Sequence, residues 1–483
     1  MLFPTIDFAI FFLVVFTGNW LLRPYRLTWR WFILAASFFF YGYWFSSRDH
    51  LPLTAILAFT IVVNWAFGRW VHQALTSEGG RTPRSRWLVR AAVVVDLGVL
   101  AYFKYVNFFV ASVADRLAFL GINSNGVMLN VILPIGISFF TFQAISYVID
   151  IGRGAWREPV PLLDFAVYLS FFAHLVAGPI VRASEFIPQL DERPDPRFVQ
   201  TSEAFMLIFR GLFKKVVISS YMATIVDPAF ALPNAHSSWE ILWAIYAYAI
   251  QIYADFSGYT DMAIGIALLL GIRFPQNFDA PYRSLSLQDF WRRWHMTLSR
   301  WLRDYLYIPL GGNRGSVLFT YRNLFFTMVI GGLWHGANWT FVIWGAIQGA
   351  YLVGERVVKE KWAERGAIGL PPKLVNVLQW ALTFNVVCFA WIFFRAATMS
   401  DAFAVIGRLF AGGGSSAQVT LLLIATIVLM VASQFVPPRI PVSVTERFAT
   451  LAPVLQMVAL GVGIVVVDAL GPEGIAPFIY FQF

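Results

Sequence analysis

Long apolar runs alternate with short polar segments along the whole 483-residue chain. Many of these runs approach the roughly 20 residues that an α-helix needs to cross a bilayer. They do not alternate with the period of two that strands of a membrane barrel would show. We therefore predict an all-α polytopic membrane protein with about eleven or twelve transmembrane helices. The candidate spans lie near 5–22, 31–47, 51–71, 88–110, 127–149, 162–182, 203–226, 239–271, 320–352, 374–394, 418–436 and 451–470.

Two segments depart from the pattern of simple spans. The run 239–271 is too long for one crossing and contains Asp255, Ser257 and Asp261, which predicts a break or re-entrant turn. The segment 282–310 mixes aromatic and Arg residues and is too charged to cross lipid unaided. It predicts an amphipathic helix at the membrane surface or along a polar cavity, starting near Ser286.

Composition and charge agree with a membrane protein. The chain is 58% hydrophobic and 13% charged, about half the charged fraction of a soluble protein. Its net charge of +9 is better explained by cytoplasmic loops than by a nucleic-acid partner. Arginines gather between the first two spans, at 23, 26 and 30, and between the third and fourth, at 81, 84, 86 and 90. The positive-inside rule then places the N-terminus outside the cytoplasm.

Several kinds of chemistry find no support in the sequence. The single cysteine, Cys388, excludes an intramolecular disulfide framework and a cysteine-rich metal site. The chain has no HExxH motif, no G-x-S-x-G elbow and no P-loop. We expect no metal, no permanently bound cofactor and no ATP-driven step.

Polar residues interrupt the apolar background within 251–261. On a helix, Asp255 would share a face with Tyr259, and Ser257 would share one with Asp261. Two carboxylates at membrane depth need partners, and the nearest basic stretch in sequence is 292–303. A structural ion-pair network and a direct functional role both remain open.

Histidines mark two further candidate sites. Trp291 and His295 are four apart and would lie on one helical face, although a headgroup-binding helix with an interfacial histidine explains them as well. His335 lies in the stretch GGLWHGAN, residues 331–338. A neutral histidine in an apolar passage could serve as a base, and Asn338, three residues on, could reach it; a satisfied core histidine is the alternative.

The glycines around His335 have a separate explanation. Gly332 and Gly336 form a small-xxx-small pair, and Gly345 and Gly349 repeat this spacing. Such pairs allow close approach of a neighbouring helix backbone. Helix packing thus accounts for the glycines and leaves the histidine unexplained.

The sequence contains five long motifs, which are LPIGISFFTFQAISYVID (133–150), HLVAGPIVR (174–182), DFSGYTDMAIGIALLLGIRFPQNFDAPY (255–282), FWRRWHMTLSRWLRDYLYIPLGGNR (290–314) and GLWHGANWTFVIWG (332–345). Together they resemble the membrane-bound O-acyltransferase family, in particular its bacterial polysaccharide branch. The match covers most of the chain. We expect one membrane-embedded domain over 1–483, with a catalytic core at about 133–345, N-terminal helices within 1–110 and C-terminal helices within 374–483.

The resemblance implies acyl transfer through a membrane-buried funnel or tunnel. The donor would be acetyl-CoA or another cytoplasmic acyl thioester, and the acceptor an extracytoplasmic polysaccharide, reached with the help of an extracytoplasmic hydrolase-like partner protein. The family's signature histidine matches His335, which would be the base, and a second family-typical polar position matches His295. Asn338 would orient His335 or stabilise an oxyanion. Residues expected to bind the donor or support the site are Trp334, Asp255, Ser257, Tyr259, Asp261, Arg292, Arg293, Trp294, Arg303 and His174.

Three functions are compatible with the sequence. An O-acetyltransferase of the bacterial inner membrane is the leading one. The alternatives are a transporter or flippase for a cell-envelope precursor, which would use the intramembrane Asp and His residues, and a non-catalytic scaffold. At the end of the chain, Tyr480 could relay the acyl group or dock the partner, whereas an interfacial aromatic belt is the simpler explanation.

Overall fold

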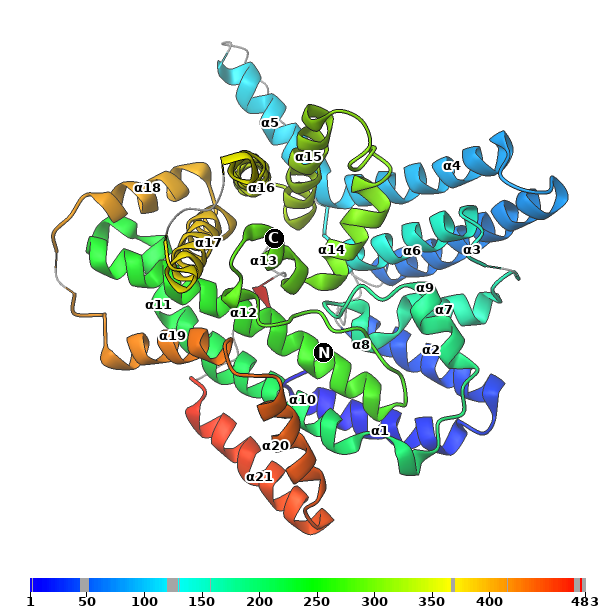
Figure 1. Ribbon diagram of the computed structural model, residues 1–483. Coiled ribbons are helices and arrows are strands. Elements are labelled where there is room, and N and C mark those ends of the chain that lie inside the picture. Colours follow the sequence, from blue (N-terminus) through cyan, green and yellow to red (C-terminus); the bar gives the residue numbers. More distant parts are fainter. Residues whose placement is uncertain are drawn as a thin grey trace. The chain divides into compact units, whose positions relative to one another are not determined.

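The computed structural model describes residues 1, 3–43, 52–119, 129, 131–156, 158–365, 370–414, 416–472 and 478–479. These residues form helices of the α, 3-10 and π types, joined by turns and loops, and they include no strand (Figure 1). The prediction of an all-α fold is confirmed.

The chain divides into two compact units, each described here by itself. The first unit comprises Met1–Thr201 and Ile266–Pro275. Within it α3 packs against α4 and α6, and α2 packs against α1 and α7. Its helices are α1 (Ile6–Leu22), α2 (Arg26–Gly42), α3 (Pro52–Ser77), α4 (Pro83–Leu100), η3 (Ala101–Tyr105), α5 (Val106–Phe119), α6 (Ile137–Gly152), α7 (Leu162–Ser170), α8 (Phe172–Leu175), α9 (Ala183–Phe186), η4 (Ile187–Leu190) and η5 (Pro196–Phe198).

The second unit comprises Ser202–Gly265 and Gln276–Phe483. Its helices are α10 (Thr201–Leu212), η6 (Phe213–Ser219), α11 (Ser220–Ala231), η7 (Pro233–Ala235), α12 (Ser238–Leu269), η8 (Pro281–Arg283), α13 (Leu287–Arg293), α14 (Met296–Leu302), η9 (Arg303–Tyr307), α15 (Val317–His335), α16 (Trp339–Arg365), α17 (Pro372–Arg395), α18 (Met399–Phe410), α19 (Leu421–Ser433), α20 (Arg439–Ala449) and α21 (Pro453–Leu470). The expectation of a single domain over the whole chain stays a prediction.

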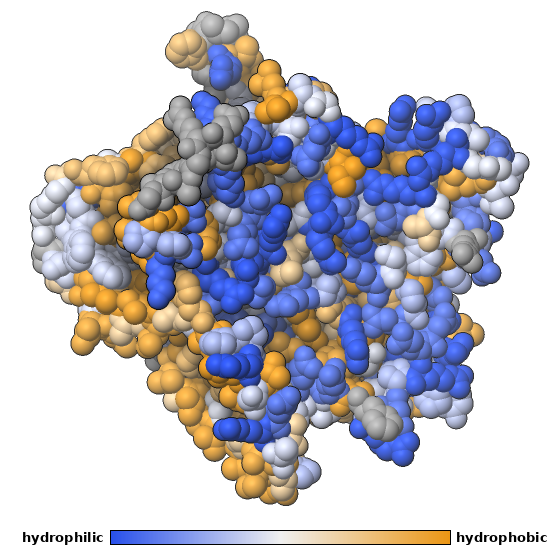
Figure 2. Space-filling model, in the orientation of Figure 1, coloured by the Kyte–Doolittle hydropathy of each residue, from blue (hydrophilic) through white to orange (hydrophobic). Residues whose placement is uncertain are grey.

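Among the described residues, five helical segments are long and apolar enough to cross a membrane. They are Leu53–Ser77, Pro83–Ala114, Val317–His335, Pro372–Arg395 and Pro453–Leu470, and shorter apolar helices cover Ile6–Leu22, Ile137–Gly152 and Leu421–Ser433. The last long segment, α21, has only 6% of its apolar window buried, and Figure 2 shows hydrophobic residues gathered on this part of the surface. Such a surface suits lipid contact. The count of eleven or twelve spans stays a prediction.

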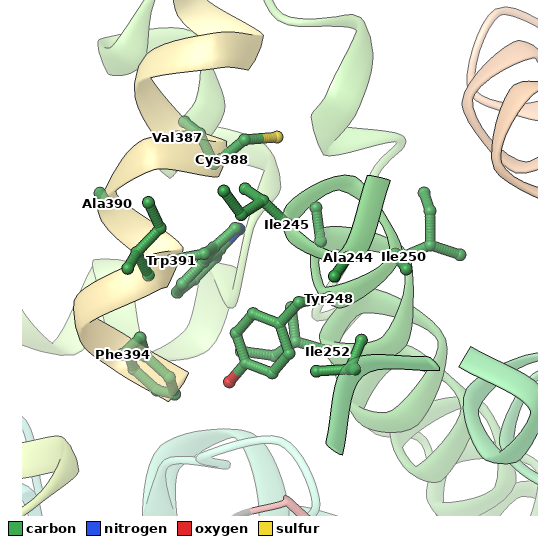
Figure 3. Packing of buried hydrophobic residues seen from close by; sticks show 14 of the residues in the cluster. Ala244, Ile245, Tyr248, Ile250, Ile252, Val387, Cys388, Ala390, Trp391 and Phe394 are labelled. Atoms are coloured by element: carbon green, nitrogen blue, oxygen red, sulfur yellow. The ribbon is translucent and has the colours of Figure 1, made fainter. Parts of the chain in front are cut away.

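The core of the second unit forms between α12 and α17. Figure 3 shows Tyr248 of α12 beside Trp391 and Phe394 of α17, with aliphatic side chains around them. Cys388 is buried in the same cluster, as expected for a small apolar residue. This core fixes the helices that carry the candidate site.

Two expectations about breaks along the chain were wrong. Helix α12 runs without interruption from Ser238 to Leu269, so the predicted re-entrant turn is absent from this part of the structure. Conversely, the run 320–352 is two helices, because α15 ends at His335 and α16 begins at Trp339. Side chains from a neighbouring helix satisfy the polar groups of α12, and the backbone therefore has no need to unwind.

The charged segment 282–310 is also broken. Ser286 caps α13 by accepting a hydrogen bond from the Asp289 N–H at 3.1 Å, which confirms the predicted start. The helix then stops at Arg293, and α14 begins at Met296. His295, between them, has the left-handed backbone conformation with φ 43°. Trp291 and His295 therefore do not share one continuous helical face, and that prediction was wrong.

Candidate functional site

The turn between α15 and α16 presents His335. Gly332, Gly345 and Gly349 lie where the two helices touch: a Cβ on Gly332 would collide with the Phe341 carbonyl, and one on Gly349 would lie 3.0 Å from the backbone of Phe325. The small residues thus allow the backbone approach that their spacing predicted. His335 is the last residue of α15, held at the end of this close-packed helix pair.

Aromatic rings surround the His335 side chain. Its ring centroid lies 5.2 Å from both Trp344 and Phe394, and 5.0 Å from Trp334, all in edge-on arrangements. The residue is 4% exposed. Surroundings of this kind exclude most water from the imidazole.

Trp334 connects His335 with the second candidate histidine. Its ring lies 6.3 Å from that of His295 and 5.0 Å from that of His335. His295 is fully buried and meets the Phe256 ring edge-on at 4.7 Å. The structure therefore brings His295, Trp334 and His335 together, although 40 positions separate the two histidines in sequence.

Asn277 holds the His295 ring. Its Oδ1 accepts hydrogen bonds from the Thr297 N–H at 3.1 Å and the Thr297 hydroxyl at 2.9 Å, which identifies this atom as the amide oxygen. Nδ1 of His295 lies 3.2 Å from the same oxygen and so carries the ring proton. Burial lowers the pKa of His295 to about 3, and the ring is neutral at ordinary pH. Nε2 is then the nitrogen with a lone pair.

Asn338 takes part in the turn after His335. Its Oδ1 accepts from the Thr340 N–H at 3.1 Å, and its Nδ2 donates to the Ala397 carbonyl at 2.7 Å. These bonds cap the start of α16 and tie it to the residues that follow α17. The helix ends at His335, so the two residues lie on either side of a turn, and the expected role of Asn338 toward His335 stays a prediction.

Polar residues of α12 face α10 and η6. Asp261 accepts two hydrogen bonds from Arg210, at 2.7 and 2.9 Å, and one from Lys214 at 2.7 Å. Lys214 also donates to Ser257 at 3.1 Å, which confirms that Ser257 and Asp261 share a face. The expectation that their partners come from 292–303 was wrong. Two adjacent lysines within the apolar run 203–226 were the signal for the true partners.

Asp255 is buried one helical turn before Tyr259. It forms an ion pair with Lys215 and lies 3.4 Å from the Ser219 hydroxyl. Its other oxygen accepts the backbone N–H of Ile479 at 2.8 Å. The ring of Phe478 lies 4.9 Å from that of Tyr259. The end of the chain thus reaches the candidate site, a contact that sequence reasoning missed.

The expected donor-binding residues have varied surroundings. Arg293 pairs with Asp289 at 3.0 Å and Asp279 at 2.8 Å, Arg303 pairs with Asp304 at 2.7 Å, and Arg292 is exposed. Trp294 is buried beside Trp391, with ring centroids 5.2 Å apart. Tyr480 lies outside the described residues, and the relay and docking hypotheses for it stay predictions.

His174 belongs to the first unit. Its ring is fully buried among the rings of Tyr168, Phe171, Phe186 and Phe274, at centroid distances of 5.3 to 6.1 Å. The first unit also contains a cavity of about 500 Å³ lined by Gln189, Glu192, Pro194, Asp195, Val199, Gln200, Leu268, Gly271 and Arg273. Neither feature includes a residue of the His295–His335 site, and a tunnel to that site stays a prediction.

Comparison with known proteins bears on what this site does. The family model described as the membrane-bound O-acyltransferase family matches residues 12–397. The chain is 42% identical to "Probable alginate O-acetylase AlgI" of Azotobacter vinelandii, over 89% of this chain and 83% of the relative. It is 39% identical to the peptidoglycan O-acetyltransferase of Helicobacter pylori, over 84% of this chain and 79% of the relative. A teichoic acid D-alanyltransferase of Bacillus subtilis is 27% identical over 55% of this chain. The chain is therefore a membrane O-acyltransferase and belongs to the membrane-bound O-acyltransferase family.

Proposed function

We propose that this enzyme moves an acetyl group from a cytoplasmic thioester, acetyl-CoA or a related donor, across the bacterial inner membrane for O-acetylation of an extracytoplasmic polysaccharide. The observation that carries the proposal is the arrangement of His335. It is a buried imidazole at a helix end, enclosed by aromatic rings and close, through Trp334, to a second buried histidine.

His335 is the proposed base. A hydroxyl acceptor gives its proton to the imidazole while its oxygen attacks the thioester carbonyl carbon. The C–O bond forms, the C–S bond breaks, and the proton then passes from the imidazolium to the departing thiolate. A site that excludes water protects the acyl group from hydrolysis.

Neighbouring residues have supporting roles in this proposal. His295, neutral and held by Asn277, is a second proton acceptor or a positioning group for the thioester. Asn338 holds the turn that follows His335 through its bonds to Thr340 and Ala397. Arg292 on α13 and Arg303 on η9, which are both exposed, are the more accessible of the arginines proposed to meet the donor phosphates.

The names of the relatives support the proposed class of acceptor. Relatives named for alginate and for peptidoglycan O-acetylation suggest a polysaccharide outside the cytoplasm. We propose that a separate extracytoplasmic protein delivers the group to the polymer, and that the N-terminus lies on that side. The intramembrane carboxylates favour this reading over a transporter, because Asp255 and Asp261 are each held in ion pairs with basic side chains.

The test compares two histidine variants in the native host. His335→Ala should lower the acetate released by mild alkali from the envelope polysaccharide by about 10²–10⁴-fold, the usual contribution of a general base. His72→Ala, on α3 of the first unit, is the matched control and should keep normal acetate. Membrane levels and detergent melting curves of both variants confirm insertion and folding. Normal acetate from correctly inserted His335→Ala would reject the proposed base.

A further inference from the structure

A buried ion pair lies beside the end of the chain. Lys215 and Asp255 are each about 1 to 2% exposed and contact each other directly. Lys215 belongs to η6, a π-helical segment whose wide turn also brings Lys214 toward α12. π-helical turns of this kind are frequent at functional sites.

This ion pair is a poor source of stability. Moving two charges out of water costs several kcal/mol per ion, about as much as their attraction returns. Replacing a buried pair with apolar residues of similar size is often neutral or stabilising. The other contacts of Lys215 and Asp255 should therefore indicate what role the pair has besides stability.

The second oxygen of Asp255 supplies that contact. It accepts the Ile479 backbone N–H at 2.8 Å, across 224 residues of sequence. Phe478 and Ile479 are themselves buried, at 0% and 3% exposure. A hydrogen bond from a backbone N–H to an ionised carboxylate is roughly twice as strong as one between neutral groups. The same carboxylate is paired with Lys215, so one side chain binds both the lysine and the backbone of Ile479.

The docked residues also contact the wall behind His295. The Phe478 ring lies 5.9 Å from that of Phe256, which in turn meets the His295 ring at 4.7 Å. The Phe478 ring also lies 4.9 Å from that of Tyr259, in a tilted arrangement. A fixed position of Ile479 therefore also fixes the neighbouring Phe478 ring, which packs against Phe256.

We propose that Asp255 and Lys215 form an anchor for the C-terminal end of the chain, and that this anchor positions Phe478 so that it completes the aromatic wall behind His295. Asp255, Lys215 and Phe478 are thus positioning residues. The second half of this inference rests on the proposed function of the His295–His335 site, whereas the anchoring itself does not.

Thiol labelling tests the anchor. In a Cys388→Ala background, Ile479→Cys places a reporter thiol at the docked position and keeps the backbone N–H. A maleimide should label it slowly in detergent-solubilised protein, while Ser416→Cys, at an exposed position, labels quickly. Replacing the pair by Asp255→Leu with Lys215→Met removes the acceptor and should raise labelling of residue 479 at least tenfold. Asp255→Asn with Lys215→Gln keeps an acceptor oxygen and should stay protected.

Activity and stability separate positioning from packing. The Leu/Met pair should melt within a few degrees of the wild type yet lose acyl transfer at least tenfold, whereas the Asn/Gln pair should retain most of it. Unchanged labelling in the Leu/Met pair would overturn the anchor. Faster labelling with undiminished acyl transfer would overturn the positioning role. A wild type without acyl transfer would reject the proposed function and leave the labelling result standing.

A change on the chain end itself provides a second route if the core variants do not insert. Ile479→Pro removes the N–H whose hydrogen bond Asp255 accepts and changes no residue of a long apolar helix, and Ile479→Val keeps the N–H. The proline variant should lose acyl transfer at least tenfold at normal membrane levels, and the valine variant should not. Equal activity of the two would also overturn the proposal.

Discussion

Two histidines, one in each unit, have nearly the same surroundings. His174 lies among four aromatic rings of the first unit, and His335 lies among three of the second. The backbone around them differs. His174 lies in the short helix α8, with Gly178 packed so closely that a Cβ there would come within 2.5 Å of the His174 Cα.

His335 has a different setting. It ends a long helix at a turn, retains 4% exposure, and connects through Trp334 to a second histidine. An aromatic cage around a buried histidine therefore does not by itself distinguish these two positions. A helix end that directs the ring toward other polar chemistry is the more informative feature.

The same substitution at both positions gives the largest predicted contrast. His335→Phe should lower acyl transfer by about 10²–10⁴-fold, because phenylalanine fills the aromatic cage and cannot accept a proton. His174→Phe should keep activity within about threefold, since that ring has a packing role. The measurement is acetate in the polysaccharide, normalised to membrane protein. Comparable losses of acyl transfer at the two positions would show that His174 and His335 do not differ in function.

Glycine substitutions test whether the close contact between the backbones of α15 and α16 is needed for stability. Gly332→Leu should destabilise the α15–α16 pair by about 3 kcal/mol or more, because overpacking there meets backbone rather than a mobile side chain. Gly354→Leu, on α16 with open space around it, should be close to neutral. Thermal unfolding in detergent measures both. A Gly332→Leu variant as stable as the wild type would show that the α15–α16 pair, at whose turn His335 lies, does not require close backbone contact.

The smallest effect concerns pH and His295. Its pKa of about 3 in the folded protein lies below the ordinary value of 6.5, so the unfolded chain binds the proton more readily between these limits. Stability should therefore fall as the pH is lowered from 6.5 toward 3, and this contribution is fully present above pH 6.5.

The His295→Gln variant isolates that contribution. Between pH 7 and 5 the wild type should lose about 2 kcal/mol more than His295→Gln. Melting curves at the two pH values give the difference. Parallel losses in both proteins would mean that His295 is not held neutral by burial.

The sequence determined the class of the protein and indicated candidate site residues. Apolar runs of membrane-spanning length predict an all-α membrane protein because a helix satisfies its own backbone hydrogen bonds in lipid. The spacing of Gly332, Gly345 and Gly349 predicts close helix contact, and a histidine in such a span is costly enough to suggest a role. The start of α13 at Ser286 also follows from local chemistry.

Only the tertiary structure decided which residues meet. Hydrophobic periodicity carries no information on partners distant in sequence, so the pairing of Asp261 with Arg210 and Lys214, the contact of His295 with Asn277, and the docking of Ile479 on Asp255 could not be predicted. The continuity of α12 and the break at His295 have the same origin. Whether a helix unwinds at a polar residue depends on the side chains that neighbouring helices supply, and those are set by packing in three dimensions.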